Sequence, residues 1–94
     1  MKSPNWFREN IESHLLGYEI EYKSFPQGDF GNLEQVAFNS DKNGGEIDFW
    51  SSGCLGMHFV DYDLGIELLN VFLLPDQDHE KGKAWETLQA LLKI

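Results

Sequence analysis

The chain has 94 residues, of which 41% are hydrophobic and 14% aromatic, and its formal net charge at pH 7 is −9. A chain of this length and apolar content folds around one core, so we expect residues 1–94 to form a single domain and exclude an intrinsically disordered protein. The acidic charge disfavours binding to nucleic acid or anionic membrane and favours basic protein partners, although it also serves simply to keep a small protein soluble.

The distribution of cysteine and of apolar residues bears on the cellular compartment. Cys54 is the only cysteine, so the chain forms no internal disulfide, which is typical of a reducing compartment. The first thirteen residues contain no apolar stretch resembling a signal peptide, and no window approaches the roughly 20 apolar residues of a membrane span. We therefore predict a soluble cytoplasmic protein.

The N-terminal residues predict a helix. Ser3 is a favourable N-cap and Pro4 suits the first helical position. An apolar stripe with a spacing of four residues follows, and Gly17 stands where a C-terminal cap is expected. The stripe consists of Phe7, Ile11 and Leu15.

Alternating apolar and polar residues predict the strands that follow. Segments rich in Pro, Gly, Asn and Asp separate these strands, and residues 26–32 (PQGDFGN) are expected to break regular structure. The last predicted strand is apolar on both alternating sides, which indicates a central position in the sheet. The predicted strands are Tyr18–Ser24, Glu34–Asn39, a third one within Gly44–Ser52, Leu55–Asp61 and Ile66–Leu74.

The C-terminal segment predicts a second helix after Pro75, capped by Asp76 or Asp78. Its apolar positions are Trp85, Leu88, Leu91 and Leu92. Short connections between the strands favour antiparallel neighbours. The predicted fold is therefore α+β, with one antiparallel sheet of four or five strands and an N-terminal and a C-terminal helix packed on one face.

Several short motifs resemble chemical sites without completing them. The segments Asp41–Glu46 and Asp61–Gly65 begin like calcium loops but lack the bidentate glutamate at the twelfth position. Cys54 and His58 would lie roughly 13 Å apart on one strand, which is too far for a nucleophile and its base. The sequence thus predicts no catalytic residue, no metal site and no cofactor.

One strand carries an unusual combination of side chains. In Glu46–Trp50, Ile47 and Phe49 would face the core, whereas Glu46, Asp48 and Trp50 would face outward. An outward Trp beside carboxylates is typical of a protein-binding surface, because Trp is enriched at interface hot spots and carboxylates attract basic partners. Alternatively, Trp50 folds under a loop or a helix edge and the carboxylates are merely solvated. The predicted partner-binding residues are Glu46, Asp48 and Trp50, supported by Asp61, Asp63 and Glu67.

The segment Gly45–Asn70, with its EIDFWSSG and HFVDYD stretches, resembles the small bacterial immunity proteins that accompany contact-dependent inhibition toxins and other polymorphic toxins. This resemblance implies a protein that binds a cognate toxin domain, commonly a nuclease, and blocks its active site or substrate groove. A nuclease is basic because it holds phosphates, so an acidic inhibitor suits it.

Two other functions remain open at this stage. The chain could be an acidic chaperone or a regulatory adaptor for another basic protein, or a small enzyme that uses Cys54 or a histidine. An exposed sheet edge or apolar sheet face would also allow a weak homodimer instead of a monomer.

Overall fold

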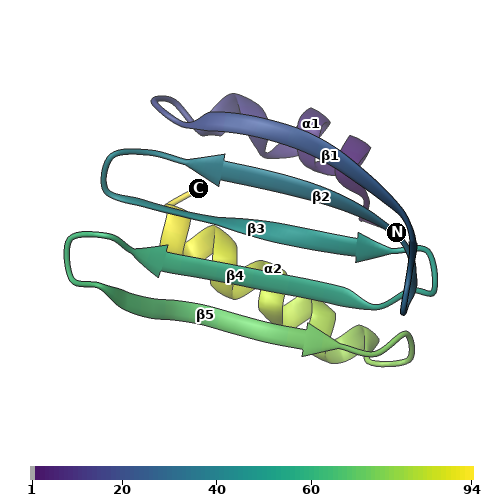
Figure 1. Cartoon of the computed structure of the whole chain (residues 1–94). Helices are drawn as coiled ribbons and strands as arrows, with labels where there is room; N and C mark the ends of the chain where they lie inside the picture. The colour runs from purple at the N-terminus through teal and green to yellow at the C-terminus, as the bar shows by residue number, and fades with distance from the viewer. Residues whose placement is uncertain (1) are drawn as a thin grey trace.

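The computed structural model describes residues 2–94 (Figure 1). Along the chain, a helical segment precedes the five strands and a second helix follows them. The elements are α1 (Pro4–Asn10), the short 3₁₀ helix η1 (Glu12–His14), β1 (Glu19–Gly28), β2 (Gly31–Asn39), β3 (Asn43–Trp50), β4 (Leu55–Asp61), β5 (Ile66–Leu73) and α2 (Asp78–Leu92).

The five strands form one antiparallel sheet in the order β1-β2-β3-β4-β5, so every strand pairs with its neighbour in the chain. Both helices pack on the same face of this sheet, which we call the covered face, and the opposite face is the open face (Figure 1). The predicted α+β class is confirmed, and the sheet has five strands rather than four.

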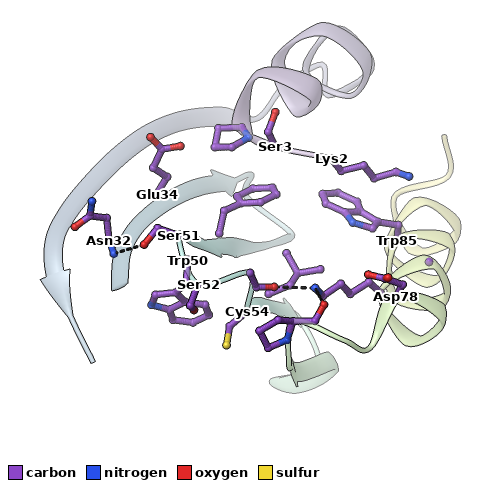
Figure 2. A pocket seen from close by; sticks show the side chains of 17 residues that line it. Lys2, Ser3, Asn32, Glu34, Trp50, Ser51, Ser52, Cys54, Asp78 and Trp85 are labelled. Carbon is purple, nitrogen blue, oxygen red and sulfur yellow. Dashed lines mark hydrogen bonds between the residues drawn. The ribbon is translucent and has the colours of Figure 1, made fainter. Parts of the chain in front are cut away.

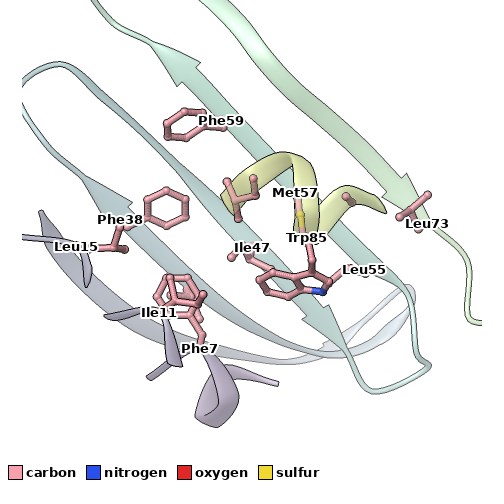
Figure 3. Close-up of a cluster of buried hydrophobic side chains, with 13 residues drawn as sticks. Phe7, Ile11, Leu15, Phe38, Ile47, Leu55, Met57, Phe59, Leu73 and Trp85 are labelled. Carbon is pink, nitrogen blue, oxygen red and sulfur yellow. The ribbon is translucent and has the colours of Figure 1, made fainter. Parts of the chain in front are cut away.

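The core lies between the covered face and the two helices (Figure 3). Alternate residues of the strands point into it, as the period-two pattern predicts. The predicted stripe of α1 is buried there too, together with Trp85 and Leu88 of α2. The strands contribute Val36, Phe38, Ile47, Leu55, Met57, Phe59 and Leu73, and the stripe contributes Phe7, Ile11 and Leu15.

The N-terminal helix is shorter than predicted. α1 begins as expected, because the Ser3 hydroxyl accepts a hydrogen bond from the Trp6 N–H at 3.2 Å, but it ends at Asn10. Ile11 is the C-cap of α1 and keeps a right-handed helical backbone conformation. η1 follows it, and Gly17 then turns the chain with a φ of +83°. The tighter 3₁₀ turn still keeps Leu15 on the core side, so all three residues of the apolar stripe are buried although the α-helix ends at Asn10.

A tyrosine on β1 anchors this N-terminal segment to the sheet. The Tyr22 hydroxyl donates a hydrogen bond of 2.7 Å to Glu12 Oε1, and the Arg8 guanidinium lies 4.2 Å from the centre of the Tyr22 ring. Burial and the bond to the Glu12 carboxylate raise the pKa of Tyr22 to about 12. The protonated phenol therefore contributes to docking of the N-terminal segment on β1.

The break expected at residues 26–32 is instead a hairpin turn. β1 continues to Gly28 and β2 begins at Gly31, so only Asp29 and Phe30 connect them. The pairing of β1 with β2 is irregular between Phe25 and Gly28, the stretch that contains Pro26. Strand pairing therefore tolerates Pro26 here because β1 is an edge strand.

The predicted central position of the fifth strand is wrong, because β5 is an edge strand. Its Leu69, Val71 and Leu73 side chains face the core, whereas Ile66 and Phe72 remain exposed. The apolar residues on its second side thus do not pack against another layer of the described structure.

The C-terminal helix buries Trp85 and Leu88 as predicted, and Leu91 and Leu92 are half-buried against the core, but the predicted cap is wrong. Gln77 occupies the N-cap position without a capping hydrogen bond from its side chain. Asp78 is the first helical residue, and its negative charge interacts favourably with the positive end of the helix dipole. Within residues 2–94, neither this helix nor any other is long and apolar enough to cross a bilayer.

Candidate functional site

The alternation predicted for β3 is confirmed. Ile47 is fully buried on the covered face, and the Phe49 ring stacks on Trp85 with 6.1 Å between ring centres. Glu46, Asp48 and Trp50 lie on the open face, where no helix covers them (Figure 1). The strand thus presents one apolar side to the core and one mixed side outward.

Trp50 belongs to an aromatic cluster that we define as Phe30, Trp50 and Phe72. The ring centres are 5.9 Å apart for Phe30 and Trp50, 5.3 Å for Trp50 and Phe72, and 5.1 Å for Phe30 and Phe72. These edge-on and tilted arrangements are the favourable ones for aromatic pairs. Trp50 is half-buried, while Phe30 and Phe72 remain 46% and 45% exposed.

Trp50 is thus neither fully exposed on the strand nor fully covered by a loop. The hairpin turn that carries Phe30 does lie against the indole, but the cluster as a whole keeps a large exposed apolar surface. Trp50 is thus a part of a patch rather than an isolated exposed side chain.

A glycine on the neighbouring strand makes room for the indole. Gly56 of β4 pairs with both Asp48 and Phe72, so it lies beside the aromatic cluster. A Cβ atom on Gly56 would lie 3.2 Å from Trp50 Cζ3 and 3.5 Å from Asp48 Cβ. The missing side chain at Gly56 therefore leaves room for the indole beside β4.

Two further apolar residues extend the patch toward β1. Leu33 pairs with Trp50 across β2 and β3, and Phe25 pairs with Leu33 across β1 and β2. Phe25 is exposed and Leu33 is half-buried. Together with the aromatic cluster they form a continuous apolar row at one end of the open face.

Carboxylates lie next to this row. Glu46 and Glu67 both contact the His58 imidazole, with Nδ1 3.3 Å from Glu46 Oε1 and Nε2 2.6 Å from Glu67 Oε2. Glu67 Oε2 also accepts a hydrogen bond from Asn70 Nδ2 at 3.1 Å. The two nitrogens of one imidazole ring thus lie within hydrogen-bond distance of two predicted site residues, so His58 brings Glu46 and Glu67 together on the open face.

Asp48 lies between the carboxylates and the apolar row. Its Oδ1 accepts a hydrogen bond of 2.8 Å from Gln35 Nε2, which orients the carboxylate without neutralising it. Lys23 is the only lysine or arginine in the five strands, and it pairs with Glu21 at 3.7 Å on the outer strand. The middle of the open face therefore carries uncompensated negative charge.

The structure separates two of the predicted residues from the others. Asp61 and Asp63 lie at the turn between β4 and β5, where Asp61 Oδ1 accepts the Leu64 N–H at 3.0 Å and closes the turn. Asn43 pairs with Asp61, and Trp50 is seven residues further along β3, a distance of roughly 24 Å. Asp61 and Asp63 are thus at the opposite end of the sheet from Trp50, and Asp61 has a structural role in the turn.

A cleft of about 820 Å³ lies near Trp50, between α1, α2 and the turn from β3 to β4 (Figure 2). Phe49, Leu55 and Trp85 are among the apolar residues that line it. Lys81 Nζ donates hydrogen bonds to the Gly53 carbonyl at 2.7 Å and to the Pro75 carbonyl at 3.1 Å. Lys81 therefore ties α2 to the turn that follows Trp50.

The described residues 2–94 contain no group of three or more His, Cys, Asp or Glu side chains arranged to hold a metal ion. Both ring nitrogens of His58 are engaged by carboxylates. The open face combines an exposed apolar centre with charged groups beside it, a composition that is typical of protein-binding surfaces.

Comparison of the chain with protein-family models, curated proteins and solved structures returned no match. Sequence reasoning missed Phe30, Leu33, Phe72 and the role of His58. The available signal was weak, because Phe30 stands in a segment that resembles an ordinary turn and Phe72 in a strand expected to be central.

Proposed function

We propose that this protein is an immunity protein, which binds a cognate toxin domain and blocks its active site or substrate groove. The observation that carries the proposal is the open face, where the aromatic cluster lies beside Glu46, Asp48 and Glu67. The toxin domain would be a basic protein, such as a nuclease, that acts in the same cytoplasm.

The aromatic cluster supplies the apolar part of such an interface. Large aromatic side chains that are partly exposed and supported from below are typical hot spots, because they bury much area with little loss of conformational freedom. The indole is held by Phe30, Phe72 and the Gly56 backbone, so it is already oriented before a partner arrives.

The carboxylates supply attraction and specificity. A nuclease must hold a phosphate backbone with Lys and Arg side chains, and a negative surface competes for those same groups. Charges beside an apolar centre mainly increase the association rate and orient the partner. The net charge of −9 also attracts a basic protein over a longer range.

The size of the molecule is sufficient for this role. Its extents are 33 × 25 × 24 Å, so one side offers an area on the order of 800 Å², which is the usual share of one partner in a stable complex. A one-to-one complex across the open face therefore needs no further element of the chain.

The test is a calorimetric titration of the protein into the C-terminal domain of the protein encoded immediately upstream of it. We expect one-to-one binding with a nanomolar Kd that weakens when the salt concentration is raised, because carboxylates contribute to the encounter. A basic protein without toxin activity serves as the control and should bind weakly. Absence of binding to the upstream domain, or equal binding to the control, would contradict the proposal.

A further inference from the structure

Asp48 and Trp50 lie side by side at Gly56. A Cβ atom on Gly56 would be 3.2 Å from Trp50 Cζ3, 3.4 Å from Trp50 Cη2 and 3.5 Å from Asp48 Cβ. Phe72 adjoins the same glycine from the other side, because Asp48, Gly56 and Phe72 occupy one row across β3, β4 and β5. Neighbouring strands are about 4.8 Å apart, so one side chain of a partner can contact this carboxylate and an aromatic ring at the same time.

The Asp48 carboxylate is oriented by the sheet but is not compensated by a cation. Its Oδ1 accepts a hydrogen bond of 2.8 Å from Gln35 Nε2, which is a neutral donor, and its Oδ2 remains available to a donor from outside the chain. Lys23 occupies the same row on β1, but its Nζ lies 3.7 Å from Glu21 Oε2. Within residues 2–94 no ion pair includes Asp48.

The covered side of the molecule shows which group completes a ring and a carboxylate of this kind. There the Arg8 guanidinium lies 4.2 Å from the centre of the Tyr22 ring, and the Tyr22 hydroxyl donates a hydrogen bond of 2.7 Å to Glu12 Oε1. A guanidinium, an aromatic ring and a carboxylate are thus gathered within one chain. Arg8 is the only arginine in the sequence, so a guanidinium over the open face has to come from another molecule.

We propose that the open face binds an arginine side chain of the partner, with the guanidinium stacked on the aromatic cluster and hydrogen-bonded to Asp48. This inference rests on the proposed function, because it names the chemical group that the same surface takes from its partner. The guanidinium donates to Asp48 Oδ2, while Gln35 keeps its hydrogen bond to Oδ1. Trp50 is then a platform for the partner's cation as well as an apolar contact.

Arginine suits these groups better than lysine does. A guanidinium is planar, stacks on aromatic rings and presents several N–H donors in a fixed geometry, whereas an ammonium is compact and strongly hydrated. Phe30 and Phe72 are 46% and 45% exposed, so both have ring surface available for stacking. Because Asp48 lies at the margin of this apolar surface, the more weakly hydrated guanidinium loses less on approaching it.

The charges around Asp48 also favour a cation from the partner. Glu46 follows the same side of β3, and His58 brings Glu67 close to it. Together with the net charge of −9 these carboxylates attract a cation from beyond contact distance. In a nuclease, an arginine that holds a phosphate would lose that contact when it binds Asp48, which connects recognition with inhibition.

The first experiment needs no partner protein. The isotope-labelled full chain is titrated with N-acetyl-arginine amide at constant ionic strength, and the indole N–H signals of its three tryptophans are followed by NMR. We expect the signal of Trp50 to shift and saturate, whereas the signals of Trp6 and Trp85, which pack against each other between the helices, stay in place. N-acetyl-lysine amide should bind about threefold more weakly. The uncharged N-acetyl-citrulline amide should bind more weakly still.

Two variants test the carboxylate. Asp48→Asn keeps an oxygen that accepts the hydrogen bond from Gln35, so it should fold, and it should weaken binding of the arginine derivative about threefold. Glu86→Gln removes the same charge from α2 and should leave the affinity as it is in the parent chain.

The titration of the unaltered chain decides the matter even if a variant fails to fold. Equal shifts of Trp50 with the arginine and citrulline derivatives, or no shift at all, would overturn the inference. Undiminished binding of the arginine derivative to folded Asp48→Asn would overturn it too. If the arginine derivative fails but the upstream domain binds, only this inference falls. If the arginine derivative binds but the upstream domain does not, only the proposed function falls.

Discussion

Both faces of the sheet contain a glycine with aromatic rings packed beside it, but only one face is covered by helices. On the covered face Gly45 lies between Phe38 and Phe59, whose rings stack with 6.0 Å between centres and are at most 1% exposed. A methyl group on Gly45 would overlap the His58 carbonyl oxygen, so only glycine allows this close approach of β3 and β4.

On the open face Gly56 leaves room for a side chain rather than for backbone, because a Cβ atom there would lie 3.2 Å from Trp50 Cζ3. The rings beside it are not sealed by a second layer, and Phe72 keeps nearly half of its surface in contact with solvent. Aromatic rings beside a glycine are therefore part of the core on one face and part of an exposed apolar patch on the other. What differs is the presence of α1 and α2, and the following substitutions separate the two roles.

The largest effect is expected on the covered face. Phe38→Ala should lower the free energy of unfolding by about 3–5 kcal/mol, because it leaves a cavity among fully buried rings. Phe72→Ala removes an aromatic ring of the same size from the open face and should cost only about 1 kcal/mol, since the ring is half exposed. Urea unfolding followed by fluorescence measures both values, and equal losses would contradict the distinction between the faces.

The next effect concerns binding to the proposed partner, the domain encoded upstream. Trp50→Ala should weaken that binding by about 2 kcal/mol or more, because the proposed interface has the indole at its apolar centre. Trp50→Phe should recover a part of the loss, and Leu16→Ala on the other side of the molecule should have no effect. A folded Trp50→Ala variant with unchanged affinity in calorimetry would remove Trp50 from the site.

A smaller effect is expected for the carboxylates of the open face. The double variant Glu46→Gln and Asp48→Asn should lose about 1 kcal/mol of binding or less, mainly through slower association. The double variant Glu9→Gln and Glu86→Gln removes the same charge from the two helices and is the matched control. Stopped-flow kinetics at two salt concentrations would show whether only the first pair changes the association rate.

The smallest effect at neutral pH is expected at the margin of the covered face. The pKa of Tyr22 is raised from 10.0 to about 12, so its contribution to stability is complete below pH 10 and is lost as the pH rises toward 12. Tyr22→Phe should therefore lose less stability than the parent chain between pH 10 and 12. Thermal unfolding across this range measures the difference, and parallel pH profiles would contradict the role of the phenol.

Most of the fold could be predicted because its signals are local. Alternation along Glu46–Trp50 identifies the face of each side chain, and the same pattern places Leu55–Asp61 as β4 to the residue. The position of β5 could not be predicted in this way. Apolar residues on both sides of a strand are usual for a central strand, and nothing local distinguishes that case from an edge strand with exposed apolar residues.

The candidate site was predictable only in part, for a related reason. Trp50 and the carboxylates beside it follow from the period of one strand. Phe30 and Phe72 reach Trp50 through the register of strands that are distant in sequence, and His58 meets Glu67 because an irregularity between Phe59 and Val60 shifts the pairing of β4 with β5. Register of this kind depends on the whole sheet rather than on any single segment.

The meander order of the strands also has a kinetic consequence. Each strand pairs with the one immediately before it, so the sheet can grow hairpin by hairpin without closing a long loop, and folding should be fast for a β-rich chain. α2 is synthesised last and covers Leu69, Val71 and Leu73 of β5 only when it docks. During synthesis the chain is thus most prone to aggregation between the emergence of β5 and the docking of α2, when both faces and the outer edge of this apolar strand are uncovered.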